Sequence, residues 1–161
     1  MEERKTQMAK LLERRLDADY TFFQLEPYVF IFDEFASFMG FVQKLDKKTR
    51  DEVNELIGRV ILQGRQLGFF FWIAMQKSDS AIISTAYRDN LPFKVVLGNA
   101  EDTTYTTTFG AGTDIPRRNF GKGEGLFTEP SLTEKPTSCG FPTLDFDIFE
   151  ALRKLGQVWV M

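Results

Sequence analysis

Two apolar runs, each followed by polar side chains, constrain the fold of this chain more than any other feature. Residues 28–32 read YVFIF and are followed by Asp33 and Glu34, and residues 69–75 read FFFWIAM and are followed by Gln76. Continuous rather than alternating apolarity is typical of strands that are covered on both faces, as in a parallel sheet. Both runs are far shorter than the roughly 20 apolar residues of a membrane-spanning helix. We therefore predict two buried strands with polar groups at their carboxyl ends.

The segments around these strands favour an α/β fold. Residues 2–18 carry apolar side chains at helical spacing, and a second helix is predicted from the capping box Thr49–Glu52 to Gly68, after a solvent-facing connection at 40–48. Further along, the pattern predicts a short helix or turn at 79–89, a strand at 93–97, a helix at 100–109 capped by Asn99, and a strand at 124–128. This alternation indicates an α/β domain with a mostly parallel sheet flanked by helices.

The C-terminal part has a different composition. Residues 129–143 contain Pro130, Pro136 and Pro142, which is typical of an irregular crossing segment. Asp145 is a candidate cap for a last helix, whose inward face is predicted to consist of Ile148, Phe149, Leu152 and Leu155. We therefore divide the chain into a first part, 1–128, and a second part, 129–161, whose helix is expected to pack on the same domain.

Composition excludes several classes of function. The 161 residues include no histidine and a single cysteine, Cys139, so serine–histidine catalysis, zinc–histidine sites and four-cysteine metal sites are excluded. One thiol cannot form an internal disulfide, which favours a reducing compartment and hence a cytoplasmic location. The net charge of −3 is not that of a domain that coats itself in nucleic acid, although a local basic patch could still contact DNA.

The polar residues after the two strands are the candidate site. Open α/β sheets bind ligands at the carboxyl ends of their strands. In nucleotide hydrolases, an acid such as Asp33 holds magnesium through water, and a second acid such as Glu34 orients the attacking water. Gln76 at the same edge could hydrogen-bond a terminal phosphate; the alternative is that all three residues merely end strands. Arg59 and Arg65 on the intervening helix are either solvent-facing side chains or an arginine finger for a neighbouring subunit's nucleotide.

Several segments resemble the FtsK/SpoIIIE family of RecA-like motor ATPases. The match runs in order over roughly residues 1–128. Its main blocks are YVFIFDEFASFM at 28–39, similar to the Walker B segment, ELIGRVILQGRQLG at 55–68, WIAMQK at 72–77, IISTAYRDNLPFKVVL at 82–97, and GKGEGLF at 121–127. One such motif would be weak, whereas five in the family's order are specific.

The resemblance implies roles for individual residues. Asp33 matches the magnesium-side acid, Glu34 the catalytic glutamate, Gln76 the phosphate sensor and Arg65 the trans-acting arginine, with Arg59 the second candidate for that role. The implied cofactors are ATP and Mg²⁺, and the implied partners are double-stranded DNA and further copies in a homo-oligomeric ring. Candidate DNA contacts are the basic residues of the glycine-rich loop, with a solvated loop as the alternative: Arg117, Arg118 and Lys122. Met75 and Lys77, where threonine and arginine are commoner, bring the chain closer to the coupling ATPases of conjugative elements.

The chain departs from the family in one important respect. It contains no G-x-x-x-x-G-K-[ST] motif, and Gly121–Gly125 lacks that spacing. The resemblance thus implies that this chain is a partial core of a larger motor and lacks the P-loop strand. On its own, the chain is expected to be inactive and to bind no cofactor. The P-loop of the motor is expected upstream, and its membrane anchor, if present, outside this chain. The resemblance also implies a free apolar edge beside residues 69–75, through which the chain could self-associate. The alternatives are a non-catalytic α/β scaffold module and an ATPase of a protein-secretion system.

Overall fold

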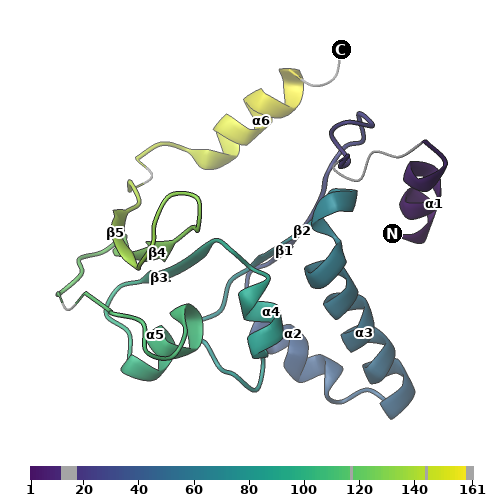
Figure 1. Cartoon of the computed structure of the whole chain (residues 1–161). Helices are drawn as coiled ribbons and strands as arrows, with labels where there is room; N and C mark the ends of the chain where they lie inside the picture. Colours follow the sequence, from purple (N-terminus) through teal and green to yellow (C-terminus); the bar gives the residue numbers. More distant parts are fainter. Residues whose placement is uncertain (12–17, 117, 144, 159–161) are drawn as a thin grey trace.

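The computed structural model (Figure 1) describes residues 1–11, 18–116, 118–143 and 145–158. Its strands form two separate sheets, one of two strands and one of three. In chain order the elements are α1 (Glu2–Leu11), β1 (Tyr28–Phe32), α2 (Phe35–Val42), α3 (Lys47–Gln63), η1 (Arg65–Leu67), β2 (Phe69–Ile73), α4 (Thr85–Asp89), β3 (Lys94–Leu97), α5 (Asp102–Phe109), β4 (Glu124–Thr128), β5 (Thr137–Gly140) and α6 (Ile148–Val158). Of the helix predicted at 2–18, residues 12–17 lie outside the described residues.

The two predicted apolar strands, β1 and β2, form the first sheet and are parallel. Their register runs from Tyr28 opposite Phe69 to Phe32 opposite Ile73. One face of this pair packs on a buried cluster from the helices, formed by Phe35 of α2 with Ile57 and Ile61 of α3. Among the described residues β2 pairs with β1 alone, so its other edge is free.

The segment between β1 and α3 is more helical than the sequence prediction. Residues 35–42 form α2, with Phe35 and Val42 buried, so helix replaces part of the predicted connection at 40–48. Helix α3 begins at Lys47, and its cap is Asp46, whose carboxylate accepts a hydrogen bond from the Thr49 backbone N–H at 3.1 Å. The predicted capping box at Thr49 is therefore wrong by one turn, because an ionised Asp three residues earlier is a strong acceptor at a helix N-terminus.

Gly68 allows the chain to turn from α3 into β2. After α3 the chain passes through η1, and Gly68 has a φ of 78°, in the left-handed region. A Cβ atom at this position would lie 2.7 Å from the Tyr20 ring. The predicted role of Gly68 as the glycine that ends this helical segment is confirmed.

The second sheet is antiparallel. Strand β4 lies between β3 and β5, with Val96 opposite Leu126 and Gly125 opposite Cys139. Its helix-covered face forms a second core with Tyr105 of α5 and Phe120. The predicted α/β class with a parallel sheet is confirmed, but the parallel pairing is confined to β1 and β2, and β5 is a strand where an irregular segment was predicted.

Asn99 does not cap α5, as the sequence predicted. The residue before that helix is Glu101. The Asn99 amide instead accepts a hydrogen bond from the Phe120 N–H at 2.9 Å and donates one to the Phe120 carbonyl at 3.1 Å. Pairing both functions of the amide with one residue fixes the loop before β4, which explains why Asn99 is used there rather than as a cap.

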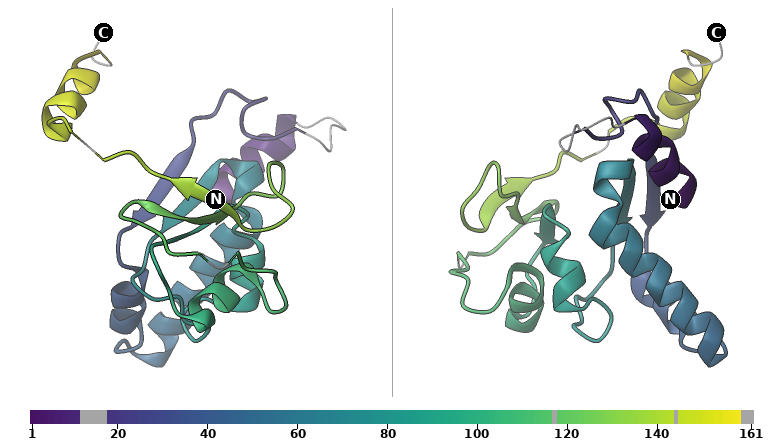
Figure 2. Two further views of the ribbon diagram at one scale, coloured as in Figure 1. Left: turned by 90° about the vertical axis from the view of Figure 1, so that its left-hand side faces the viewer. Right: turned by 45° about the vertical axis from the view of Figure 1, so that its right-hand side comes forward.

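The C-terminal helix α6 stands clear of the rest of the molecule in all views (Figures 1 and 2). Three residues of its predicted inward face are exposed instead, Ile148 by 39%, Phe149 by 72% and Leu152 by 57%, and the side chain of Leu155 lies outside the described part of the chain. Its first-turn N–H groups donate to Asp147, so the predicted cap at Asp145 is wrong by two residues. No helix among the described residues is long and apolar enough to cross a membrane.

Candidate functional site

Two backbone hydrogen bonds hold the carboxylates after β1 against the end of β2. The Ala74 N–H donates to the Phe32 carbonyl at 2.8 Å, and the Phe35 N–H donates to the Ala74 carbonyl at 2.9 Å. The Phe35 side chain, 1% exposed, anchors this turn in the core. Asp33 and Glu34 therefore lie at the carboxyl edge of the parallel pair, where ligands bind in open α/β sheets.

Glu34 has an unusual environment. It occupies the position before α2, but its side chain makes no capping hydrogen bond. Its Oε1 atom is buried and has no hydrogen-bond partner among the described residues. A buried acceptor without a partner costs free energy, so such atoms in folded proteins usually meet a water or a ligand. The neighbouring Asp33 side chain is exposed.

Gln76 lies at the same edge of the sheet, as predicted. It follows β2 by three residues and is exposed, and the parallel register places Ile73, where β2 ends, opposite Phe32, where β1 ends. The next residue, Lys77, forms an ion pair with Glu101 before α5, with Nζ and Oε2 2.8 Å apart. This pair raises the pKa of Lys77 and lowers the pKa of Glu101. Sequence reasoning missed the pair, because nothing local connects two residues 24 positions apart.

Arg65 lies at the opposite edge of the sheet from the carboxylates. It belongs to η1, before β2, and the five residues of β2 separate it from Gln76 by a strand length of about 16 Å at 3.3 Å per residue. Its guanidinium is exposed and makes no hydrogen bond or ion pair within the described residues. Arg65 therefore cannot reach the carboxylates of its own chain and is open to another molecule.

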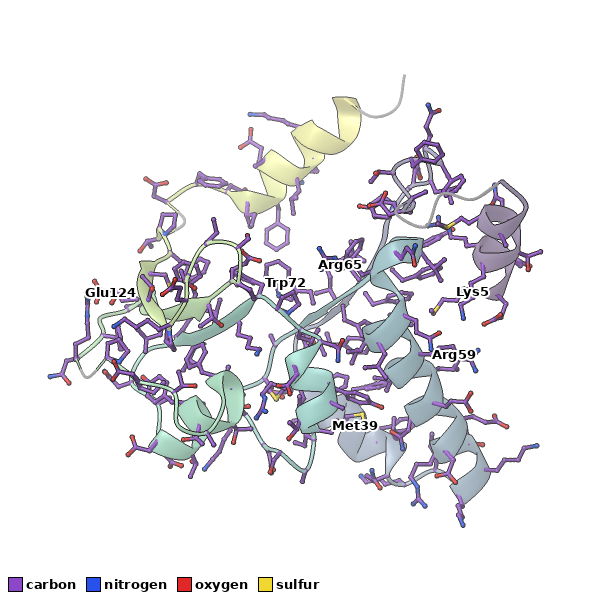
Figure 3. The ribbon with its side chains drawn as sticks, viewed as in Figure 1. Lys5, Met39, Arg59, Arg65, Trp72 and Glu124 are labelled. Carbon is purple, nitrogen blue, oxygen red and sulfur yellow. The ribbon has the colours of Figure 1, made fainter. Side chains whose placement is uncertain are left out.

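Arg59, the second candidate for the trans-acting arginine, already forms ion pairs within its own chain. Its guanidinium lies 2.5 Å from a carboxylate oxygen of Glu55 and 3.4 Å from one of Glu2, and the Glu55 hydrogen bond and charge raise its pKa. In Figure 3, Arg59 lies on the side of α3 that faces α1, near Lys5, whereas Arg65 is drawn closer to Trp72. The pair with Glu2 makes Arg59 a contact between α3 and α1, whereas the pair with Glu55 lies within α3.

The basic loop before β4 is only partly available for DNA. Arg118 donates to Ser138 and Glu124, and it lies over the Phe120 ring at 5.0 Å. The hydrogen bond from the Gly121 N–H lowers the pKa of Glu124 most, and Arg118 lowers it further. Lys122 is exposed, and Arg117 lies outside the described residues.

The carboxylates do not form a complete metal site by themselves. Among the described residues, no group of three or more acidic, histidine or cysteine side chains is placed to hold a metal ion. Mg²⁺ usually keeps several waters and takes only one or two carboxylates together with substrate phosphates. Asp33, exposed beside Glu34, is compatible with that kind of coordination.

The chain resembles known proteins in both sequence and fold. No family model matches the chain. It is 32% identical over 124 residues to the FtsK domain-containing protein YdcQ of Bacillus subtilis (strain 168), a match that covers 77% of the chain and 25% of that protein. Its fold resembles the monomer form of the pCW3 conjugation coupling protein TcpA with ATPγS, with a TM-score of 0.63, 17% identity, and coverage of 96% of this chain and 46% of that one. The chain thus spans a quarter to under half of the lengths of these relatives. The sequence match places the chain in the FtsK family, and the likeness to TcpA shows that it shares the fold of that protein.

Proposed function

We propose that this chain is the part of an ATP-driven double-stranded DNA translocase that supplies the Walker B acids, the phosphate sensor and the trans-acting arginine. The observation that carries the proposal is that Asp33, Glu34 and Gln76 follow the ends of two paired parallel strands, and that a buried Glu34 oxygen has no partner among the described residues. In a motor, a water molecule on its way to the γ-phosphate would provide that partner. Phosphoryl transfer requires such positioning and little covalent chemistry from the protein.

Each side chain has a distinct task in this proposal. Asp33 holds Mg²⁺ through water, and the bound ion supplies charge neutralisation on the ATP phosphates. Glu34 accepts a hydrogen bond from the attacking water and orients it, since Phe35 and Ala74 fix its backbone. Gln76 donates its amide to the terminal phosphate. A phosphate-binding loop from outside residues 1–161 completes the site.

Arg65 acts on the nucleotide of a neighbouring subunit in this scheme. Its position at the far edge of the sheet and its unpaired guanidinium support this role over one in its own site. Such an arrangement needs a homo-oligomeric ring in which adjacent subunits share each active site. DNA would be held through its phosphates, a contact that needs no base-specific recognition.

Conjugative DNA transfer is the subtype that we favour. The structural neighbour TcpA is named as a conjugation coupling protein, and its structure was solved with ATPγS. Met75 and Lys77, which follow β2, fit the same group. Chromosome partitioning, a protein-secretion ATPase and a non-catalytic scaffold are the other candidates.

The test is ATP hydrolysis, with and without double-stranded DNA, by a protein in which this chain follows the P-loop part of the same motor. We expect DNA-stimulated turnover that falls by at least 100-fold in Glu34→Gln, while the 161-residue chain alone shows none. Glu52→Gln is the matched control, because Glu52 is an exposed glutamate on α3. Turnover indifferent to DNA would favour the secretion ATPase, and absent turnover the scaffold.

A further inference from the structure

The backbone of residues 65–68 carries Arg65, and all of its carbonyl oxygens are hydrogen-bonded within the chain. The Arg65 carbonyl accepts a hydrogen bond from the Gly68 N–H at 3.1 Å, inside the turn that η1 forms. The other carbonyls accept hydrogen bonds from residues 1–28: Gln66 from the Tyr20 N–H at 2.9 Å, Leu67 from the Arg4 guanidinium at 3.0 Å, and Gly68 from the Tyr28 N–H at 2.7 Å. The last carbonyls of a helical segment have no partner within that segment. The N-terminal part of the chain therefore supplies the partners that this turn lacks.

Arg4 of α1 joins this turn to the beginning of both strands of the first sheet. While its Nη1 atom donates to the Leu67 carbonyl, its guanidinium lies 4.4 Å from the centre of the Tyr28 ring and 5.2 Å from that of the Phe69 ring. The two rings stack on each other across the parallel pair, with their centroids 5.2 Å apart. A planar guanidinium can stack on an aromatic ring and donate a hydrogen bond at its edge in the same geometry. Arg4 thus fixes η1 against β1 and β2.

Gln66, the residue after Arg65, ties the same turn to residues 18–20. Its side-chain amide donates to the Ala18 carbonyl at 3.1 Å, and its own carbonyl accepts from the Tyr20 N–H. The packing here is close, since Ala18 is 5% exposed and a Cβ atom at Gly68 would lie 2.7 Å from the Tyr20 ring. Opening these hydrogen bonds would leave polar groups without partners beside packed apolar atoms, which costs free energy. The backbone that carries Arg65 is therefore held in one conformation.

We propose that Arg4 and Gln66 are positioning residues for Arg65, and that they hold the η1 backbone where the Arg65 guanidinium reaches a neighbouring subunit's nucleotide. This inference rests on the proposed function, in which Arg65 acts in trans. An arginine of that kind stabilises charge in the transition state, and a displacement of about 1 Å can lower a rate by about 100-fold. The Arg65 side chain itself is long and has many rotamers. Its backbone is the part that the fold can fix in advance, and Arg4 and Gln66 fix it.

The next residue of α1, Lys5, provides a matched control for Arg4. Its Nζ atom donates to the Gln63 side chain of α3 at 3.0 Å and to Glu2 of its own helix at 3.4 Å. Lys5→Met therefore removes a charge and a hydrogen bond between α1 and α3, as Arg4→Met removes a charge and a hydrogen bond between α1 and η1. Only the second substitution takes away a partner of the carbonyls at 65–68. A difference between the two variants thus reports on the η1 contact.

The first experiment measures amide hydrogen exchange in the 161-residue chain, residue by residue, by NMR. We expect the N–H groups of Tyr20 and Gly68 to exchange at least about 10-fold faster in Arg4→Met and in Gln66→Met than in the wild type, because the turn opens locally more often. The Ala74 N–H, at the other end of β2, and every amide of Lys5→Met should keep their wild-type rates. Unchanged exchange at Tyr20 and Gly68, or equal acceleration at Ala74, overturns the proposal.

The second experiment measures DNA-stimulated ATP hydrolysis by the P-loop-containing protein. We expect Arg4→Met to lower kcat by at least about 10-fold and to change KM for ATP by less than about twofold, because an interaction made in the transition state is weakened. In an Arg65→Ala background the same substitution should have no further effect, since no guanidinium is left to position. Lys5→Met should keep the wild-type kcat.

The outcomes separate this proposal from the proposed function. If Arg65→Ala lowers kcat but Arg4→Met causes the same loss with and without Arg65, the loss does not pass through Arg65; the positioning role is then wrong and the trans role of Arg65 stands. If Arg65→Ala leaves kcat unchanged, or the wild-type protein shows no turnover, the proposed function itself is contradicted and the positioning role with it.

Discussion

The two faces of the β1–β2 sheet have nearly the same composition but different surroundings. On one face, Phe32, Phe71 and Ile73 pack on the buried cluster that includes Phe35, whereas Tyr28 and Phe30 earlier in β1 are 53% and 41% exposed. On the other, Ile31 and Trp72 remain largely exposed. Each apolar run is continuous and contributes side chains to both faces, so its composition does not show which face is covered. The helices that follow each strand make that distinction, because they all return to the same side.

The comparison extends to polar groups. Among the described residues the core contains no buried polar or charged residue. The partnerless carboxylate oxygen belongs to Glu34, at the edge of the sheet where the strands end. The exposed apolar side chains Ile31 and Trp72 and the partnerless oxygen of Glu34 thus lie away from the buried cluster. The following predictions test this difference between covered and exposed groups.

The largest effect is expected on the covered face. Phe35→Ala removes a fully buried ring that contacts Phe32 and Phe38, and we expect it to lower the free energy of unfolding by about 3–5 kcal/mol. Urea unfolding followed by circular dichroism measures it. Phe41→Ala on the same helix is the control, because Phe41 is 61% exposed and should cost under about 1 kcal/mol. Equal losses in the two variants would show that α2 does not pack as described.

Glu34→Gln should change stability in the opposite direction. Removing the charge from a buried oxygen without a partner relieves a desolvation penalty, so we expect a gain of about 1 kcal/mol in the free energy of unfolding. The same urea experiment detects it, with Glu52→Gln as the exposed control. A loss of stability in Glu34→Gln would mean that the carboxylate has a structural partner, and the argument for a water or ligand at Oε1 would fail.

Much of the fold and of the candidate site could be predicted from the sequence, and the predictions that failed did so for physical reasons. The strands, their parallel pairing and the polar edge followed from local apolar runs and from the resemblance of residues 28–39 to the Walker B segment. The caps at Thr49, Asn99 and Asp145 were wrong because neighbouring acids or distant backbone groups compete for the same roles. The prediction that both faces of these strands are covered was wrong: Ile31 and Trp72 are 72% and 61% exposed. Apolar composition does not show which side of a sheet the helices cover.

The sheet face that carries Ile31 and Trp72 should tolerate polar substitution in the monomer. Ile31→Thr keeps a β-branched side chain suited to a strand, and at 72% exposure we expect a change of less than about 0.5 kcal/mol in the free energy of unfolding. The measurement belongs at low protein concentration, where association is negligible. Ile57→Thr, on the covered face, is the control and should cost several times more. A large loss in Ile31→Thr at low concentration would show that this face is covered within the chain.

The smallest effect is expected at the ion pair between the two sheets. Lys77→Ala removes the 2.8 Å contact with Glu101, but both side chains are mostly exposed, so we expect a decrease in Tm of less than about 2 °C. The pKa of Glu101 is lowered, so the stabilisation from its charge is present above its ordinary value of 4.5 and is lost as the pH falls through its pKa in the folded chain. The pKa of Lys77 is raised, so the contribution of Lys77 is present below its ordinary value of 10.5 and is lost as the pH rises through the raised pKa.

The difference in Tm between the wild type and Lys77→Ala should therefore be greatest between about pH 5 and pH 10 and should shrink at both ends. High salt should reduce it at every pH, because the pair is exposed to solvent. Lys48→Ala is the control: its ion pair with Glu52 lies within α3 and does not join the two sheets. If Lys77→Ala has no effect while DNA-stimulated turnover still falls in the P-loop-containing protein, the pair positions the Gln76 loop without stabilising the fold. That result would place Lys77 with the functional groups of the sheet edge.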